Sequence, residues 1–455
     1  MTAVLRGAVG GRTASTWVAA GGLAWLALNA VILATSPLDR AVGLTIAQVI
    51  AIGGTLAVVA VARRTEAPET VRVLVVLWGL KMVGTAARYY VLQVTYGGAG
   101  DANRYAYIGT LLAEKFKSGD ISTYQSHQNL VGTQFVEMVT GGLFAVTGPT
   151  LIGASMVFST LGFVGLYLTF RALRVSYPEA DPTRLALLGL GLPSMVFWPS
   201  SLGKEALMVF AIGIVVYGAA WTWTGRRGGV LVIAVGLVAS ALVRPHVTVL
   251  LVAGLLGASV LVRAESRPEA VLLKLLRTGL FVGALVGAVA ASSAFFGLSQ
   301  VDSSGVSDVL ERTEEQTAQG GSSFAAVNPL LFPVAAVTVL YRPFPFEAGN
   351  LQGAIASVEG TLLLYLTWRR RRHLLGMISH ARERPMVAFT LVYAAVFVMA
   401  FSQFGNFGLL ARQRVQLYPL LVGLLAVDAA RAPVTRAVRA AGGRARERRT
   451  LAGAS

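Results

Sequence analysis

The sequence contains no cysteine, and histidine occurs only four times in 455 residues. The chain therefore has no disulfide, no thiolate metal ligand and no cysteine nucleophile. The histidines lack the spacing of a paired metal-binding motif, and there is no Gly-Lys-Ser/Thr phosphate loop, dinucleotide fingerprint or Gly-x-Ser-x-Gly elbow. The sequence predicts no metal site and no cofactor, and it argues against a machine driven by ATP or NAD.

Charged residues are scarce as well, at 13% against 55% hydrophobic, and the mean hydropathy is +0.65. Apolar runs of about 20 residues, long enough to cross a hydrocarbon layer of about 30 Å, recur along most of the chain. The formal net charge of +17 does not indicate nucleic-acid binding, because the basic residues separate apolar runs instead of forming a continuous stripe. These features predict an integral membrane protein.

The apolar runs predict an all-α, polytopic fold with about twelve transmembrane helices. Two shorter runs, 131–147 and 329–341, are flanked by Gly, Pro or Asn and are expected to form interfacial or re-entrant helices. The predicted spans lie near residues 16–36, 42–62, 71–92, 149–173, 185–202, 205–224, 229–243, 246–263, 278–298, 351–368, 386–404 and 415–430.

Lys and Arg are distributed unequally between the two sets of connections. With the N-terminus in the cytoplasm, 27 of them fall in cytoplasmic segments and ten in outer segments, while Lys81 and Arg88 lie inside the third helix. Basic residues near helix ends remain on the cytoplasmic side. The distribution therefore predicts cytoplasmic N and C termini, which requires an even number of spans.

No internal repeat divides the chain, so residues 1–430 are predicted to form a single transmembrane domain, followed by a basic cytoplasmic tail at 431–455 that is disordered or bound to anionic lipid. Segments 93–148 and 299–350 are predicted to be long extracytoplasmic loops. The first contains an amphipathic stretch, 105–116, expected to form a helix on the membrane surface. The second contains the polar stretch 303–323, which is expected to be mobile.

Asp101 opens the first long loop in the sequence Gly-Asp-Ala-Asn-Arg-Tyr. A carboxylate within reach of a sugar hydroxyl can remove its proton during attack on an anomeric carbon, so Asp101 is a candidate general base. Asp also favours helix starts, and a capping role is the alternative. The residue type does not decide between them.

The segment from Pro193 to Glu205 combines two prolines, Phe197 and Trp198 with a following Lys204. The prolines break the helix near its outer end and leave backbone groups that lipid cannot satisfy, so this segment is expected to face protein or water. Lys204 is predicted to hold a lipid-linked phosphate. The segment that precedes it is interrupted by prolines and rich in aromatic residues, and such an interruption costs backbone hydrogen bonds, which favours a functional reason for it. A solvated turn is the alternative.

Three clusters of cations lie on the predicted outer face. The guanidinium fork suits phosphate and pyrophosphate oxygens, so together the clusters predict a phosphate site. For any one arginine the alternatives are snorkelling at the interface or an ion pair with Glu205 or Glu347. The clusters are Arg244-Pro245-His246, Tyr341-Arg342-Pro343-Phe344-Pro345-Phe346-Glu347 and Arg412-Gln413-Arg414.

At these residues the chain resembles bacterial polytopic membrane glycosyltransferases of the GT-C type and the related oligosaccharide-repeat polymerases. The resemblance rests on Gly100-Asp101 with Tyr105, on the Pro193 to Glu205 segment and on Arg342-Pro343-Phe344. It implies a sugar donor linked to polyprenyl phosphate or pyrophosphate at the outer leaflet, with an outer-loop carboxylate as base. By this resemblance Asp101 is the base, Lys204, Arg244, Arg342 and Arg414 bind the carrier phosphate, and the supporting residues are Arg104, Tyr105, Glu205, His246, Glu347 and Arg412.

The leading hypothesis is a metal-independent glycosyltransferase or glycan polymerase of a bacterial cell membrane. Its partners are a polyprenyl-linked sugar donor and a glycan or lipid acceptor, and its site is a single outer cavity around Asp101, Lys204, Arg244 and Arg342. A transporter or flippase for a lipid-linked or anionic solute is one alternative. A non-catalytic membrane subunit of an envelope assembly complex is another.

Overall fold

The computed structural model describes residues 25–27, 29–121, 130–263, 268–296, 323–325 and 327–427. These residues are almost entirely helical and include no β-strand, only an isolated bridge between Ser323 and Asn406. Residues 303–322 of the predicted mobile stretch 303–323 and the tail 431–455 lie outside the described residues, as do residues 1–24. The helices are α2 Leu38–Ala62, α3 Pro68–Tyr90, the π-helical η1 Val91–Thr95, α4 Asp101–Lys117, α5 Thr133–Thr147, α6 Leu151–Ser176, α7 Pro182–Leu190, α8 Pro193–Phe197, α9 Lys204–Trp223, α10 Gly229–Val243, α11 Pro245–Leu261, α12 Pro268–Phe296, α14 Phe332–Tyr341, the 3-10 turn η2 Pro345–Glu347, α15 Leu351–Arg369, α16 Arg371–Ser379, α17 Pro385–Phe401, α18 Phe407–Gln413, the 3-10 turn η3 Arg414–Gln416 and α19 Tyr418–Ala426.

Five helices in the described part of the chain are long and apolar enough to cross a membrane. Shorter apolar helices accompany them, and the predicted spans that fall on described residues are helical, except that 185–202 is broken into two short helices. The all-α membrane character predicted from composition is therefore confirmed. The five long stretches are Leu38–Ala62, Pro68–Thr95, Leu151–Ser176, Lys204–Trp223 and Val271–Ala290.

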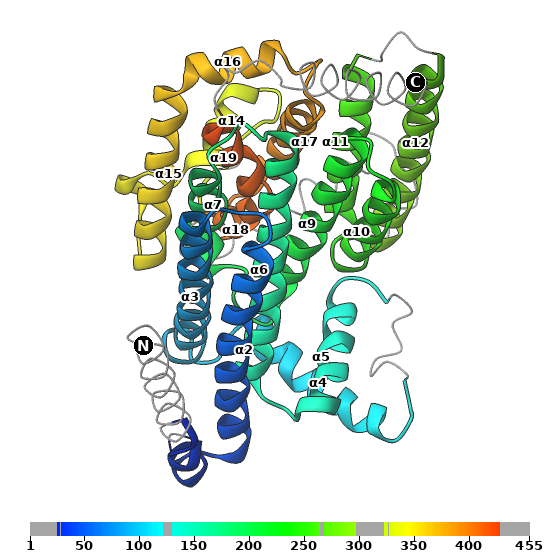
Figure 1. Ribbon diagram of the computed structural model, residues 1–455. Helices are drawn as coiled ribbons and strands as arrows, with labels where there is room; N and C mark the ends of the chain where they lie inside the picture. The colour runs from blue at the N-terminus through cyan, green and yellow to red at the C-terminus, as the bar shows by residue number, and fades with distance from the viewer. Residues whose placement is uncertain are drawn as a thin grey trace, which may run out of the picture.

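The connections that the charge distribution assigns to the cytoplasm contact one another. Glu66, after α2, forms ion pairs with two arginines at the end of α6. Its carboxylate oxygens lie 3.6 Å from an Nη of Arg171 and 3.4 Å from Nε of Arg174. Arg384, before α17, lies 3.4 Å from Glu179, before α7. The backbone of Arg263 donates to that of Arg382, and Arg370 donates to the carbonyl of Leu425. In Figure 1 α16 lies at this end, and α4 and α5 lie at the opposite end.

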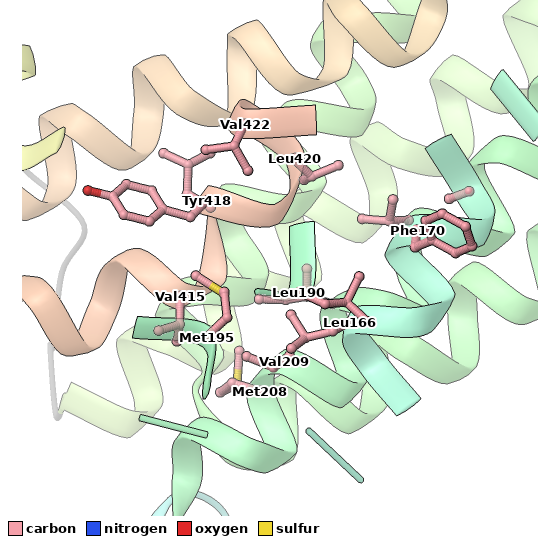
Figure 2. Packing of buried hydrophobic residues seen from close by; sticks show 14 of the residues in the cluster. Leu166, Phe170, Leu190, Met195, Met208, Val209, Val415, Tyr418, Leu420 and Val422 are labelled. Carbon is pink, nitrogen blue, oxygen red and sulfur yellow. The ribbon is translucent and has the colours of Figure 1, made fainter. Parts of the chain in front are cut away.

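The centre of the bundle is α9, which packs against α6 and α10. Its buried residues are spread around the whole helix, the pattern of a helix enclosed by protein. α2, by contrast, buries only Ala41, Gly43 and Ala62 and presents its remaining apolar surface outward. Figure 2 shows the core where α6, α7, α8, α9 and the segment from η3 to α19 meet: Leu166, Phe170, Leu190, Met195, Met208, Val209, Val415, Tyr418, Leu420 and Val422.

The predicted helix at 185–202 is broken into α7 and α8, as its prolines require. The ammonium of Lys81 on α3 donates to the carbonyl of Met195 at 2.8 Å, and the carboxylate of Glu359 on α15 accepts from the backbone N–H of Ser194 at 2.7 Å. All of this lies inside protein, where water cannot satisfy the freed backbone groups. Two neighbouring helices therefore supply the partners that the break removes.

At the end of the bundle opposite α16, α4 and α5 pack against each other (Figure 1). The predicted amphipathic helix is α4, whose buried positions are Ala102, Tyr105, Gly109, Leu112 and Ala113. This buried face contacts α5, where a Cβ on Gly109 would collide with Thr140. The amphipathic pattern therefore reflects a helical hairpin.

We expect the crossing of α6 and α9 to require glycine. A Cβ on Gly165 would overlap the backbone carbonyl of Val209, which cannot move without shifting α9, whereas Gly53 on α2 has open space. Overpacking typically costs about 1–3 kcal/mol. Gly165→Ala should lower the apparent melting temperature of the purified protein in detergent, and the control Gly53→Ala should not. Equal melting temperatures for the two variants would contradict the tight crossing.

Candidate functional site

A cavity of about 480 Å³ lies at the same end of the bundle as α4. It is enclosed by the end of α3, the start of α4, the segment between α8 and α9, η2, the start of α15 and α18. Segments from both halves of the sequence thus contribute to one space. Its charged and amide-bearing lining residues are Arg88, Asp101, Glu205, Glu347, Asn350, Gln352, Asn406 and Arg412.

Asp101 is the first residue of α4, and Gly100 occupies the N-cap position with φ +139°, a conformation that favours glycine. No side-chain capping hydrogen bond forms at this helix start, so the capping alternative for Asp101 is not supported. The carboxylate is 58% exposed, and its Oδ2 lies 3.3 Å from an Nη of Arg412. Asp101 is therefore an accessible carboxylate at the cavity wall.

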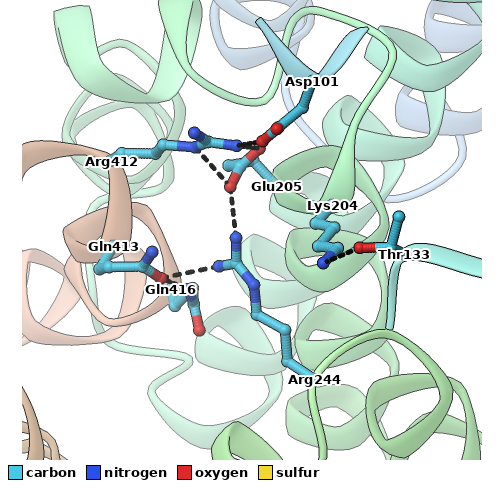
Figure 3. A network of polar contacts seen from close by, with 8 residues as sticks. All are labelled: Asp101, Thr133, Lys204, Glu205, Arg244, Arg412, Gln413 and Gln416. Atoms are coloured by element: carbon cyan, nitrogen blue, oxygen red, sulfur yellow. Dashed lines mark hydrogen bonds and ion pairs between the residues drawn. The ribbon is translucent and has the colours of Figure 1, made fainter. Parts of the chain in front are cut away.

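Glu205 stands in the first turn of α9, where the helix dipole favours a negative charge. It is buried and is shared by two arginines (Figure 3). Arg244 donates to its Oε1 at 2.5 Å, and Arg412 approaches Oε1 at 2.7 Å and donates to Oε2 at 3.0 Å. One carboxylate thus joins α9 to two segments more than thirty residues away in sequence.

Arg412 lies on α18, a short helix that begins at a capping asparagine. The side chain of Asn406 accepts hydrogen bonds from the backbone of Gly408 and Leu409 at 2.9 and 3.1 Å. The Glu205 carboxylate raises the pKa of Arg412, against the lowering effect of burial, and Asp101 adds to the increase. Arg412 therefore remains a cation that contacts both carboxylates.

Arg244 sits at the junction of α10 and α11 and is buried. Its second Nη donates to the side-chain oxygen of Gln413 at 2.7 Å, and Gln416 donates to the same oxygen at 2.5 Å. These contacts lie behind Glu205 as seen from Asp101 (Figure 3). Arg244 anchors the network and is not among the residues lining the cavity.

Lys204 points away from the Glu205 network toward α5 (Figure 3). Its ammonium donates to the hydroxyl of Thr133 at 2.9 Å, and it does not line the cavity. On the same side, Arg104 lies 3.5 Å from Glu137 of α5. Burial raises the pKa of Glu137, although Arg104 and Lys204 oppose that increase. Tyr105 is buried, and burial raises its pKa.

Arg342 pairs with Glu347 across η2 and lies over the rings of Phe324 and Phe407, 4.9 and 5.0 Å from their centroids. Burial opposes ionisation of Glu347, but hydrogen bonds from Arg342 and from the backbone of Phe344 outweigh it and lower the pKa. Arg414 donates to the backbone carbonyls of Thr338, Val339 and Arg342. Both arginines hold the α14–η2 segment in place.

Of the four side chains predicted to surround one cavity, Asp101, Lys204, Arg244 and Arg342, only Asp101 lines it. Asp101, Glu205, Glu347 and Arg412 line one cavity, whereas Lys204, Arg244, Arg342 and Arg414 do not. Arg244 and Arg342 donate to two of the lining carboxylates from behind, and Lys204 and Arg414 donate to oxygens elsewhere. Arg104, Tyr105 and His246 also lie outside the lining. The alternative expectation for the arginines, an ion pair with Glu205 or Glu347, describes three of them. Arg244 and Arg412 pair with Glu205, and Arg342 pairs with Glu347.

Sequence reasoning missed Arg88 as a site residue. It lines the cavity, and its guanidinium carbon lies 5.0 Å from the ring centroid of Phe197 and 4.9 Å from that of Trp198. The available signal is its spacing from Lys81: seven residues, or about two helical turns, place both cations on one face of α3. Cations on one stripe of an apolar helix are expected to face protein or a cavity.

A second cavity, of about 250 Å³, adjoins the first and shares Trp198, Gln352, Ala356 and Ala411 with it. It lies between α3, α8 and α15 and is lined mainly by apolar side chains, with Glu359 and Arg414 as its charged residues. The site thus combines a polar chamber with an apolar chamber, a shape suited to a ligand that has a polar head and an apolar chain.

Comparison with protein-family models, with curated proteins and with solved structures gives no match to this chain. The chemistry of the site follows from its own groups. An accessible carboxylate can accept a proton, and cations fixed nearby can stabilise charge that develops on a reacting oxygen. In the described part of the chain no group of three His, Cys, Asp or Glu residues is placed to hold a metal ion.

Removing the charge of Glu205 should destabilise the fold. Glu205→Gln leaves the buried guanidinium of Arg244 and that of Arg412 without their shared carboxylate, which typically costs about 3–5 kcal/mol for a broken buried pair. A matched control is Glu69→Gln, which removes an exposed pair with Arg72 and should change stability by at most about 1 kcal/mol. Denaturant unfolding in detergent would measure both, and similar values would contradict the anchoring role of Glu205.

Proposed function

We propose that the chain is a metal-independent membrane glycosyltransferase or glycan polymerase that moves sugar from a polyprenyl-phosphate or pyrophosphate donor to a glycan or lipid acceptor. We place it in the cytoplasmic membrane of a bacterium with about twelve spans and both termini in the cytoplasm. The functional face is then extracytoplasmic. The contacts among the arginine-rich connections at one end of the bundle, with the cavity at the other, support this orientation.

The observation that carries the proposal is the junction of the two cavities. The polar chamber exposes the Asp101 carboxylate, and the apolar chamber begins at Trp198 and continues along α3 and α15. A lipid-linked sugar has the same division into a hydroxyl-rich head, an anionic linker and an apolar chain. The two chambers together therefore match that class of ligand better than a free sugar or a free lipid.

In the proposed reaction the acceptor hydroxyl lies within hydrogen-bond reach of Asp101. Asp101 takes the proton as the acceptor oxygen forms a bond to the anomeric carbon, and the bond between that carbon and the phosphate oxygen breaks. The lipid phosphate leaves with the electron pair. Arg412, beside Asp101, contributes positive charge at the polar chamber, and fixed positive charge stabilises an oxyanion as it develops.

A transporter or flippase is the second candidate, and the break between α7 and α8 favours it. Transporters commonly bind solutes at interrupted helices near buried charges, and here Lys81 and Glu359 hold the ends of the break. Both charges are bound to backbone, however, and the larger chamber lies at one end of the bundle. In reconstituted vesicles, movement of a lipid-linked sugar across the bilayer without bond formation would favour this candidate.

Asp101→Asn should abolish transfer while leaving the protein in the membrane. Removal of a general base typically lowers the rate by about 10²–10⁴-fold. Membranes containing the chain are incubated with a panel of radiolabelled polyprenyl-phosphate hexoses and pentoses, and label entering glycan is counted. The matched control is Asp39→Asn, an exposed acid in the first turn of α2, which should leave the rate unchanged.

Protein level, measured by immunoblot, separates loss of catalysis from loss of fold. Undiminished transfer by Asp101→Asn would remove Asp101 from the base role. Absence of transfer by the unaltered chain with every donor in the panel would count against the proposed function itself.

Single cysteines can test the proposed orientation, because the native chain has none. Val146 at the end of α5 and Ser379 at the end of α16 are exposed and lie in segments assigned to opposite sides. In intact cells a membrane-impermeant maleimide should label Val146→Cys and leave Ser379→Cys unlabelled until the cells are opened. The reverse pattern would invert the proposed orientation.

A further inference from the structure

Arg88 differs from the other arginines at this end of the bundle in what surrounds it. Its Nε and one Nη are buried and have no hydrogen-bond partner among the described residues. Its neighbours are instead the faces of two aromatic rings, Phe197 and Trp198. Arg104, Arg244, Arg342, Arg412 and Arg414, by comparison, each have a carboxylate, an amide or backbone carbonyls.

A cation held this way is stabilised only in part. Stacking on aromatic rings stabilises the charge, but the guanidinium still lacks the oxygen acceptors that water would give it. The nearest carboxylates are already engaged, because Glu205 binds Arg244 and Arg412, and Asp101 binds Arg412. Because the Nε and one Nη of Arg88 are out of contact with solvent, an anion entering the cavity would supply the missing acceptors once the guanidinium turns toward it.

The balance of charge around the chamber agrees with this. Asp101 and Glu205 face Arg88, Arg244 and Arg412, with Lys204 on the neighbouring side, so cations exceed carboxylates. Glu347 also lines the chamber, and its charge is matched by Arg342. The lining itself carries two arginines and three carboxylates, and the cations directly behind it, Arg244, Arg342 and Lys204, bring the whole cluster to five cations against three carboxylates. Within this cluster Arg88 is the cation that contacts aromatic rings and no carboxylate among the described residues.

Arg88 also marks the boundary between the two chambers. It lines the polar one, while its chain neighbour Ala87 lines the apolar one together with Val83 and Ile355. Trp198, which stacks on Arg88, lines both. An anionic group bound at Arg88 would thus have an apolar path beginning beside it.

We propose that Arg88 binds the phosphoryl group of an amphiphile, whose chain occupies the apolar chamber between α3, α8 and α15. The proposal rests on the proposed function and deepens it, because it assigns the carrier phosphate to Arg88 instead of to the four cations expected from the sequence. Phe197 and Trp198 lie over the guanidinium, and a guanidinium, being planar, can meet phosphate oxygens in a bidentate contact.

Binding can be measured without any sugar transfer. The purified full chain in detergent is titrated with farnesyl phosphate, farnesol and inorganic phosphate, with calorimetry as the readout. The unaltered chain should bind farnesyl phosphate at least about tenfold more tightly than either farnesol or inorganic phosphate, because only this probe fills both chambers. Arg88→Gln should lose that advantage and bind farnesyl phosphate no more tightly than farnesol.

Two further variants guard against loss of fold. Arg88→Lys keeps the charge but not the flat fork, and it should bind farnesyl phosphate between the unaltered chain and Arg88→Gln. Arg72→Gln removes the exposed arginine near the other end of α3 and should bind as the unaltered chain does. Melting temperatures are recorded for all of them.

Equal affinity of Arg88→Lys, Arg88→Gln and the unaltered chain for farnesyl phosphate would overturn the proposal. If inorganic phosphate bound as tightly as farnesyl phosphate, the ligand would be a free anion, and the proposal that it is an amphiphile would be overturned. Failure of the unaltered chain to prefer the phosphorylated probe over farnesol would overturn the anion site. Binding that depends on Arg88 in a chain that transfers no sugar would keep this site and count against the transferase alone.

Discussion

The carboxylate of Glu205 is the point at which three separate parts of the chain meet. It begins α9, the most enclosed helix of the bundle, and it binds Arg244 from the junction of α10 and α11 and Arg412 from α18. The buried guanidinium of Arg244 and the partly buried one of Arg412 would be costly without a shared counter-charge. The position of α18, and with it the wall of the cavity, therefore depends on one ion-pair cluster that is formed only when the bundle is assembled.

The break between α7 and α8 imposes a second constraint that leads to the same cavity. Interrupting a helix away from water leaves backbone groups that need partners, and Lys81 and Glu359 provide them from two flanking helices. With its ends fixed, α8 presents Phe197 and Trp198 to Arg88 and separates the polar from the apolar chamber. The same feature that costs helical hydrogen bonds gives the site its division into two parts.

The helices were largely predictable from the sequence, because the thickness of the hydrocarbon layer sets their length and prolines and glycines set their ends. α9 begins at Lys204, one residue from the predicted start, and α10 matches its predicted range at both ends. Partners were not predictable in the same way. Lys204 and Glu205 are neighbours in sequence, yet their side chains diverge to Thr133 and to two arginines, because successive residues on a helix point about 100° apart. Arg88 escaped notice because its surroundings depend on how α8 packs against α3.

The two carboxylates that Arg412 contacts, Asp101 and Glu205, have different surroundings, and the proposed reaction depends on that difference. Glu205 is buried and takes the shorter contacts of Arg412, at 2.7 and 3.0 Å, in addition to Arg244. Both arginines need the negative charge of Glu205, so protonating this carboxylate would break its ion pairs with Arg244 and Arg412. Asp101 is 58% exposed and takes the longer contact, at 3.3 Å. A proton arriving on Asp101 would weaken one longer contact, while Arg412 stays in place through Glu205. Of the two acids, Asp101 is therefore the one that can change its charge during a reaction without disturbing the framework that positions it.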